Sequence, residues 1–396
     1  MKSGYPLATT TWDDAEYAAM HRVIESGRFT MGPAVQAFES SFAAWHGSKF
    51  AVMVNSGSSA NLLMVAALFY RETDPLQPGD EVIVPAVSWS TTYAPLSQYG
   101  LTIRLVDIDP KTLNFDIEAL EAAVSDRTRL IFAVNLLGNP NDFGEIHKIA
   151  AARGITFIED NCESLGAELN GRKTGTFGLM GSFSSFFSHH ISTMEGGVVL
   201  TDDEDIYHIL LSLRAHGWTR NLPEETRIAG TKNPDDFFES FRFVLPGYNL
   251  RPLELSGAIG CEQVKKLDAL IDGRRRNADV FQRLMANHPV LELQAEIGKS
   301  SWFGFALVVK PEVEYSREAL RLALDRIGVE YRPIVAGNFA NQVMLKHMNV
   351  HGLEHLPNAD VIQDRGLFIG NHHYDVTDHL RMIAEVGRYP VKEKER

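Results

Sequence analysis

The sequence has few cysteines, no excess of positive charge and no long apolar run, and each absence excludes a class of protein. Its 396 residues include only Cys162 and Cys261, too few for a disulfide framework or for the four thiolates of an iron–sulfur cluster. A formal net charge of −13 argues against a surface that binds nucleic acid. No apolar stretch is long enough to cross a bilayer, and residues 1–14 lack the apolar segment of a secretory signal. We therefore expect a cytoplasmic protein with no nucleic-acid or membrane partner.

Apolar strands alternate with helices along most of the chain. Phe38, Phe42 and Trp45 recur at i, i+4 and i+7, and Gly47 follows them, which predicts an amphipathic helix that ends at the glycine. Strands are predicted at residues 51–55, 81–85, 102–106, 130–135 and 155–158, and further helices at 60–70, 117–123 and 145–152. This alternation is typical of an α/β fold with a mostly parallel central sheet covered by helices.

The last third of the chain predicts a smaller domain. Residues 253–270 have the pattern of a helix that leads into it. Further elements are expected at 302–309 and 317–327, with a C-terminal helix at 378–386. We therefore expect a large domain over residues 1–254 and a small α+β domain over residues 255–396.

Several polar residues stand where a predicted strand ends. Gly57 and Ser58 lie between a strand and a helix, where backbone N–H groups and the helix dipole attract an anion, although a serine that only caps the helix fits equally well. Glu159 and Asp160 close an apolar strand. A carboxylate at that edge either keeps a pyridine nitrogen protonated or caps the next helix. Glu163, three residues on, either faces the same site or completes a capping box.

Two more stretches carry candidate residues. Trp89 either stacks on a planar cofactor or belongs to the core, and the core is the better placement for this residue taken alone. Ser184 either offers its hydroxyl to a phosphate or stands in an ordinary turn. His189 and His190 would point to opposite faces of a strand, so at most one can serve a given site. No HExxH or CxxC pattern accompanies them, so we expect no metal ion. A lone histidine is more often structural than catalytic.

The order and spacing of these patterns resemble the sugar aminotransferase family of fold-type I pyridoxal phosphate (PLP) enzymes, which act on nucleotide-linked keto sugars. The resemblance runs nearly end to end, through the segments at residues 29–33, 55–61, 84–92, 158–164, 181–197 and 247–252. It implies a fold-type I aminotransferase fold. It also implies that Gly57, Ser58 and Ser184 bind the cofactor phosphate.

The same resemblance assigns the other cofactor contacts. It implies that Trp89 stacks on the ring, that Asp160 pairs with the pyridine nitrogen and that Glu163 lies near the ring hydroxyl. It implies further that Asn249 reaches the phosphate from a neighbouring subunit. A site shared in that way implies a homodimer.

The chain departs from the family pattern at the residue that should hold the cofactor. Aligned without a gap, the segment 181–197 places His189 where the family has a lysine, and His190 one position beyond. An imidazole moves protons, but it cannot form the covalent imine that a primary amine forms. A histidine at this place resembles the members of the family that remove the C-3 hydroxyl of a nucleotide-linked keto sugar.

The resemblance therefore implies a 3-dehydratase for a GDP-linked 4-keto-6-deoxy sugar, with His189 as its base. It would work with pyridoxamine phosphate (PMP), which L-glutamate regenerates from PLP. Two cysteines cannot hold the iron–sulfur cluster of a related CDP-sugar enzyme, so none is expected. A GDP-sugar 4-aminotransferase of the GDP-perosamine type and a non-catalytic sensor remain as alternatives. The candidate sugar-binding residues are His216, Arg220, Phe243 and Arg332.

Overall fold

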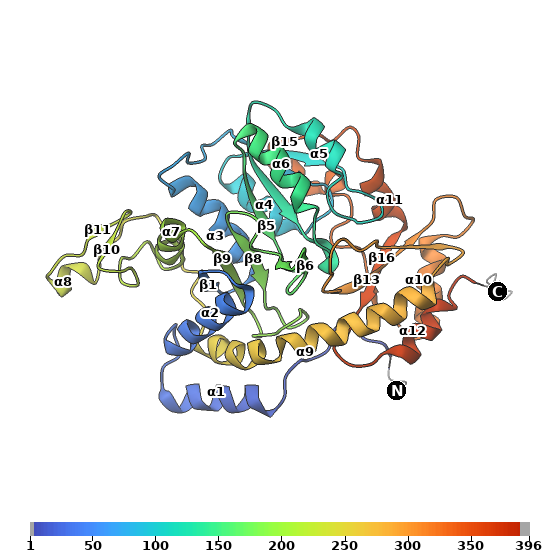
Figure 1. The fold of residues 1–396 in the computed structure, drawn as a ribbon, viewed down its shortest axis with the longest axis horizontal. Helices are drawn as coiled ribbons and strands as arrows, with labels where there is room; N and C mark the ends of the chain where they lie inside the picture. The colour runs from blue at the N-terminus through green and yellow to red at the C-terminus, as the bar shows by residue number, and fades with distance from the viewer. Residues whose placement is uncertain (1–3, 389–396) are drawn as a thin grey trace.

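The computed structural model describes residues 4–388, and a large, mostly parallel sheet forms its centre (Figure 1). The eight strands lie in the order β1 (Phe50–Val54), β9 (Gly197–Thr201), β8 (Gly181–Ser184), β5 (Thr156–Asp160), β4 (Thr128–Val134), β2 (Glu81–Pro85), β3 (Thr102–Val106) and β15 (Val350–His351). Only β9 runs antiparallel to its neighbours within this sheet of the described chain. The predicted α/β class is confirmed.

Helices cover both faces of this sheet. Those that flank it are α2 (Pro33–His46), α3 (Gly57–Tyr70), α4 (Ser90–Gln98), α5 (Ile117–Ala123), α6 (Phe143–Arg153) and α7 (Glu204–Arg214). On β2, Val82 and Val84 join a core with residues of α3, α4 and α7, whereas Ile83 joins a second core with residues of α5 and α6. Successive strand side chains point to opposite faces, so the apolar runs predicted as strands are buried on both sides.

A second, smaller sheet lies beside the first and is antiparallel (Figure 1). Its strands are β12 (Leu291–Leu293), β13 (Gly304–Val309), β16 (Gly366–Gly370) and β14 (Tyr331–Arg332). They share a core with α10 (Arg317–Arg326), α12 (Thr377–Ala384) and the second half of the long helix α9 (Glu254–Met285). The predicted smaller α+β unit is therefore present, and its elements match those expected at 302–309, 317–327 and 378–386.

Two segments cross the expected boundary near residue 254. Tyr5 is 1% exposed within the core of the small sheet, and its hydroxyl donates to the Gly370 carbonyl at 2.7 Å. In the other direction, β15 adds to the edge of the large sheet beside β3. Helix α9 begins at Glu254 and packs against both units. The division into residues 1–254 and 255–396 stays a prediction, and these two segments would tie its halves together.

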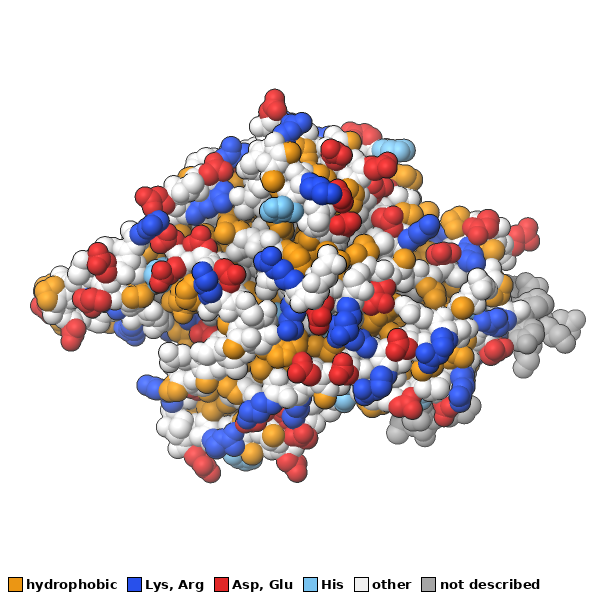
Figure 2. All heavy atoms as spheres, viewed as in Figure 1, with side chains coloured by type: hydrophobic (Ala, Val, Ile, Leu, Met, Phe, Trp, Pro, Cys, Tyr) orange, Lys and Arg blue, Asp and Glu red, His pale blue; other side chains and the backbone are white. Residues whose placement is uncertain are grey.

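An arm projects from the body beside α7, formed by β10 (Glu225–Thr226), β11 (Gly230–Thr231) and α8 (Asp236–Glu239) (Figure 1). Phe237, Phe238 and Phe241 on this arm are 78%, 63% and 66% exposed. Figure 2 shows hydrophobic side chains near its tip, and acidic and basic side chains interspersed over the rest of the face in view. No helix within residues 4–388 is long and apolar enough to cross a membrane.

Candidate active site

A cavity of about 450 Å³ lies at the carboxyl edge of the large sheet. Asp160 at the end of β5 and Ser184 at the end of β8 line it, together with the first turn of α3. Arg332 and Phe368 of the small sheet also line it, together with Phe303, the residue just before β13. Ligands of open α/β sheets bind at this edge, and the volume suits a small molecule.

The first turn of α3 forms one end of the cavity. Ser56 caps the helix by accepting a hydrogen bond from the Ser59 N–H at 3.1 Å, so the amides of Gly57 and Ser58 are the ones that an anion can use. A Cβ atom on Gly57 would lie 2.7 Å from the Cβ of Ser184 and 2.9 Å from the Sγ of Cys162. Only glycine fits at this position, and both Ser58 and Ser184 line the cavity beside it.

Asp160 is held rigidly at the floor of the cavity, where it is 5% exposed. Its Oδ2 accepts hydrogen bonds from Asn61 Nδ2 at 2.7 Å and from Thr92 Oγ1 at 2.9 Å, and its Oδ1 accepts one from the Cys162 N–H at 3.1 Å. Asn61 lies one turn along α3 from Gly57. Three donors fix the orientation of this carboxylate toward any ring that enters the cavity.

The two neighbouring glutamates have different surroundings. Glu159 is fully buried and accepts hydrogen bonds from the backbone N–H groups of Gly175, Phe177 and Gly178, so it anchors a loop and does not face the cavity. Glu163 lines the cavity and accepts from the Leu137 N–H at 3.1 Å. Burial raises the pKa of the Glu163 carboxyl to about 7, and the nearby Asp160 adds to this effect. Glu163 can therefore hold a proton near neutral pH.

Trp89 lies on the wall of the cavity and is 58% exposed. The core placement expected for this residue taken alone is therefore wrong. Trp89 is the residue just before α4, and the turn that follows β2 carries its side chain out of the sheet. An exposed indole at a cavity mouth is available to stack on a planar ligand.

The histidine pair lies in a turn after β8 and not on a strand. His189 lines the cavity, and its buried Nδ1 makes no hydrogen bond within the described residues. Burial lowers the pKa of His189 to about 4, with the positive charge of Arg274 as a smaller cause. His190 is fully buried outside the cavity, where its Nε2 lies 3.1 Å from the Ser301 carbonyl. Only His189 is placed to act on a bound molecule.

Phe303, just before β13, and Arg332, on β14, complete the lining from the second half of the chain. The ring of Phe303 lies 5.1 Å from the His189 ring, centroid to centroid. Arg332 supplies the only Lys or Arg side chain among the described residues that line the cavity. Arg332 was expected on polarity and resemblance, but no signal in the second half of the sequence pointed to Phe303.

Four expected site residues do not line the cavity of their own chain. Asn249 is exposed and pairs through its backbone with Ala215, next to His216. Phe243 is 54% exposed and pairs with Trp218, and the guanidinium of Arg220 lies 4.4 Å from the Trp218 ring. His216 also lies against Trp218, with ring centroids 4.6 Å apart. The structure thus gathers these residues on a second surface.

The cavity fits a pyridoxal-type cofactor without a covalent anchor. It combines an anion cup, a fixed carboxylate and an exposed indole. None of the described residues that line it is a lysine. The fold and the cavity together define an enzyme of the PLP-dependent, fold-type I aminotransferase class.

Residues 11–386 match the model of the DegT/DnrJ/EryC1/StrS aminotransferase family, and the chain belongs to that family. A GDP-4-keto-6-deoxy-D-mannose 3-dehydratase of Yersinia pseudotuberculosis is 56% identical over 383 residues, or 96% of this chain and 98% of that protein. A solved structure of GDP-4-keto-6-deoxymannose-3-dehydratase with a trapped PLP-glutamate geminal diamine has a TM-score of 0.95 and 56% identity, covering 96% of this chain and 99% of the other. A mutant of that enzyme with bound GDP-perosamine gives the same TM-score, identity and coverage.

Proposed function

We propose that this chain is a PLP- and PMP-dependent 3-dehydratase. It converts GDP-4-keto-6-deoxy-D-mannose into GDP-4-keto-3,6-dideoxy-D-mannose, with L-glutamate as the amino donor. The observation that carries the proposal is His189 in the cavity, because the residues that hold a PLP-type cofactor are present while no lysine lines the described wall. Without a lysine the cofactor would not be bound covalently to the protein, so its amine form, PMP, would be the form held in the cavity.

The cofactor contacts follow from the geometry of the wall. The amides of Gly57 and Ser58, with the hydroxyl of Ser184, would hold the phosphate. Asp160 would keep the pyridine nitrogen protonated, and Trp89 would cover one face of the ring. When bound, the cofactor supplies an electron sink for the breaking of bonds next to its amine. Glu163 would share its proton with the ring hydroxyl.

His189 would move the proton that the reaction needs. The burial that lowers its pKa to about 4 keeps the imidazole neutral at working pH, so it can accept a proton at a ring nitrogen. The same nitrogen can then deliver the proton to the departing C-3 hydroxyl oxygen, which leaves as water. The sugar loses one oxygen overall, and the two electrons come from glutamate, which becomes 2-oxoglutarate and ammonia.

We propose further that two chains form a homodimer with shared sites. Asn249, His216, Arg220 and Phe243 lie together but away from the cavity of their own chain, as the site residues of a partner would. Asn249 would reach the phosphate bound by the partner, and the other three would face its sugar. The exposed phenylalanines of the arm supply apolar surface for such an association.

We place the enzyme in the cytoplasm. Cys162 and Cys261 are both free thiols, as expected in a reducing compartment. A GDP-linked sugar and glutamate are the small-molecule partners of the proposal.

The test is the identity of the product. The protein would be incubated with GDP-4-keto-6-deoxymannose, PLP and L-glutamate, and the nucleotide sugar analysed by mass spectrometry. We expect a ketone that is lighter by one oxygen atom, with one ammonia and one 2-oxoglutarate formed per turnover. A product that keeps its C-3 hydroxyl and carries a C-4 amine would identify a 4-aminotransferase instead. If the sugar is unchanged, the non-catalytic sensor is the alternative that remains.

A further inference from the structure

The loop that carries His189 is held from behind by two residues outside the cavity. This loop, residues 185–196, joins β8 to β9. The indole Nε1–H of Trp12 donates to the Ser192 carbonyl at 2.9 Å, and the Ser192 N–H donates to Gln263 Oε1 at 3.0 Å. Both polar groups of the Ser192 backbone are therefore engaged, and Ser192 itself is 4% exposed.

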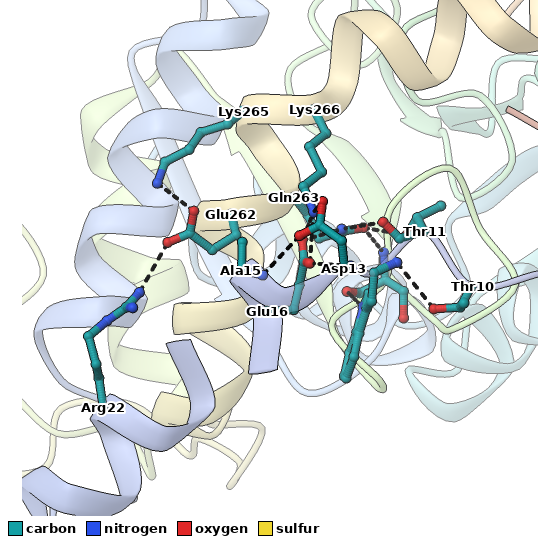
Figure 3. Close-up of polar contacts among 12 residues, drawn as sticks. Thr10, Thr11, Asp13, Ala15, Glu16, Arg22, Glu262, Gln263, Lys265 and Lys266 are labelled. Carbon is teal, nitrogen blue, oxygen red and sulfur yellow. Dashed lines mark hydrogen bonds and ion pairs between the residues drawn. The ribbon is translucent and has the colours of Figure 1, made fainter. Parts of the chain in front are cut away.

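Gln263 is itself fixed in position. It is fully buried on α9, and its Oε1 also accepts from Thr11 Oγ1 at 2.5 Å. Its Nε2 donates to Glu16 Oε1 at 2.7 Å and to the Thr11 carbonyl at 3.2 Å. Figure 3 shows Gln263 pointing from α9 toward Thr11 and toward Glu16 of α1 (Asp14–Ser26), with Lys266 close to Glu16. A buried amide with both ends engaged cannot rotate without losing hydrogen bonds.

The loop that contains both Ser192 and His189 is closed by its own hydrogen bonds. The Thr193 N–H donates to the Ser185 carbonyl at 2.8 Å, and the hydroxyls of the same two residues lie 2.6 Å apart. The Ser185 N–H donates to the Gly196 carbonyl at 2.9 Å, and the His189 N–H donates to the Phe186 carbonyl at 2.9 Å. Ser192 and His189 thus lie in one short loop whose two ends are tied together, with only two residues between them.

We propose that Trp12 and Gln263 are positioning residues for His189, which hold its loop against the cavity through the backbone of Ser192. This inference rests on the role of His189 in the proposed function. The anion cup and Asp160 lie on α3 and β5, and neither Trp12 nor Gln263 hydrogen-bonds them. Loosening the clamp should thus slow proton transfer and leave cofactor and sugar binding intact, since a small misplacement of a reacting group costs rate.

Trp12→Phe is the direct test. It keeps an aromatic ring at the position that lies 5.8 Å from the Tyr17 ring, and it removes the N–H that holds Ser192 together with one ring of the indole. The matched control is Trp45→Phe, which deletes an indole N–H bond of similar length, 3.0 Å to Asp268 of α9, but no hydrogen bond to the His189 loop. Trp45 packs against the apolar cluster that contains Ile191, so this variant also controls for the loss of indole volume near the loop. We expect Trp12→Phe to lower kcat by about 10- to 100-fold, with KM for the sugar and Kd for PMP within about twofold of the parent. Trp45→Phe should leave all three near the parent values.

Two further measurements separate positioning from general destabilisation. Amide hydrogen exchange of the cofactor-free protein should be faster across residues 186–192 in Trp12→Phe and unchanged there in Trp45→Phe. In a His189→Asn background, Trp12→Phe should cause no further loss of kcat, because its effect passes through His189. Faster exchange with an unchanged kcat, or a lower kcat with unchanged exchange, would overturn the positioning role. If the parent makes no dehydrated product, the proposed function fails, and unaltered exchange in Trp12→Phe would refute the clamp independently.

Discussion

The ring of Phe303 lies against the imidazole of His189, with centroids 5.1 Å apart and planes inclined at 57°. His189 belongs to the large sheet's loop and Phe303 to the segment that enters β13 of the small sheet, so the two units meet at this contact. Phe303 helps to bury the imidazole, and burial is the main cause that lowers the pKa of His189 to about 4.

The first prediction concerns the acid side of the pH–rate profile. A base must be deprotonated to act, so kcat/KM should hold above the pKa of His189 and fall as the pH approaches about 4. Phe303→Ala admits water to the imidazole and should raise its pKa toward the ordinary value, which moves the acid limb to higher pH. Phe303→Leu, which keeps an apolar side chain, should move it less. Identical acid limbs in all three proteins would contradict this account of the pKa.

The second prediction compares the two histidines. His189→Asn should lose a factor of roughly 10²–10⁴ in kcat, as expected for the loss of a general base, while Kd for PMP changes little. His190→Asn should cost much less, because His190 lies outside the cavity beside the Ser301 carbonyl. Steady-state rates and PMP titrations of both variants provide the measurement. A larger loss of rate in His190→Asn would show that the other histidine faces the reaction.

The third prediction concerns the covalent state of the cofactor. Because none of the described residues lining the cavity is a lysine, borohydride treatment of the PLP-loaded protein should leave the polypeptide mass unchanged. His189→Lys should restore a primary amine there, so the same treatment should add the mass of reduced PLP at that position. Dehydration by this variant should fall, since a lysine amine has a reference pKa of about 10.4 and is a poor base when protonated. A parent protein that gains the adduct, or a His189→Lys variant that dehydrates as fast as the parent, would contradict the prediction.

The fourth prediction tests the shared sites. His189→Asn and Asn249→Ala should each be impaired when purified alone. If Asn249 completes the cavity of the partner, subunit exchange between the two variants creates mixed dimers in which one of the two sites is intact. Activity should then return on mixing, to about a quarter of the sites for equal amounts and random pairing. Activity that stays at the average of the two variants, with dimers confirmed by sedimentation, would place Asn249 in its own chain's site or in none.

The secondary structure in and around the large sheet was largely predictable. Residues 81–85, 102–106 and 117–123 were expected as two strands and a helix and form β2, β3 and α5 with the same bounds. Their apolar runs end in turn residues, and such patterns act over a few residues of chain. The long helix α9 was expected only to residue 270. The residues beyond it are rich in charge, so the apolar side chains of α9 that pack on the small sheet were not recognised as part of the same helix.

The cavity was predictable in part for the same reason. Asp160 and Ser184 end strands and Gly57 comes shortly after one, and parallel strands bring their carboxyl ends to one edge whatever the rest of the fold does. The placement of Trp89 was wrong when judged alone, since whether an indole after a strand is buried depends on what packs over it. Only the tertiary structure decides whether Trp89 is covered, and here its side chain stays exposed at the cavity.

The sequence by itself determined the alternation of strands and helices, the polar residues at strand ends and the imidazole at position 189, because each of these depends only on residues that are close together in the chain. Only the tertiary structure decided that Phe303 covers this imidazole and that Trp12 and Gln263 hold its loop. These contacts join segments far apart in sequence, and they form only when the small sheet, α9 and the N-terminal segment have docked on the large sheet. No local pattern encodes such docking, because it depends on the combined shape of the buried surfaces.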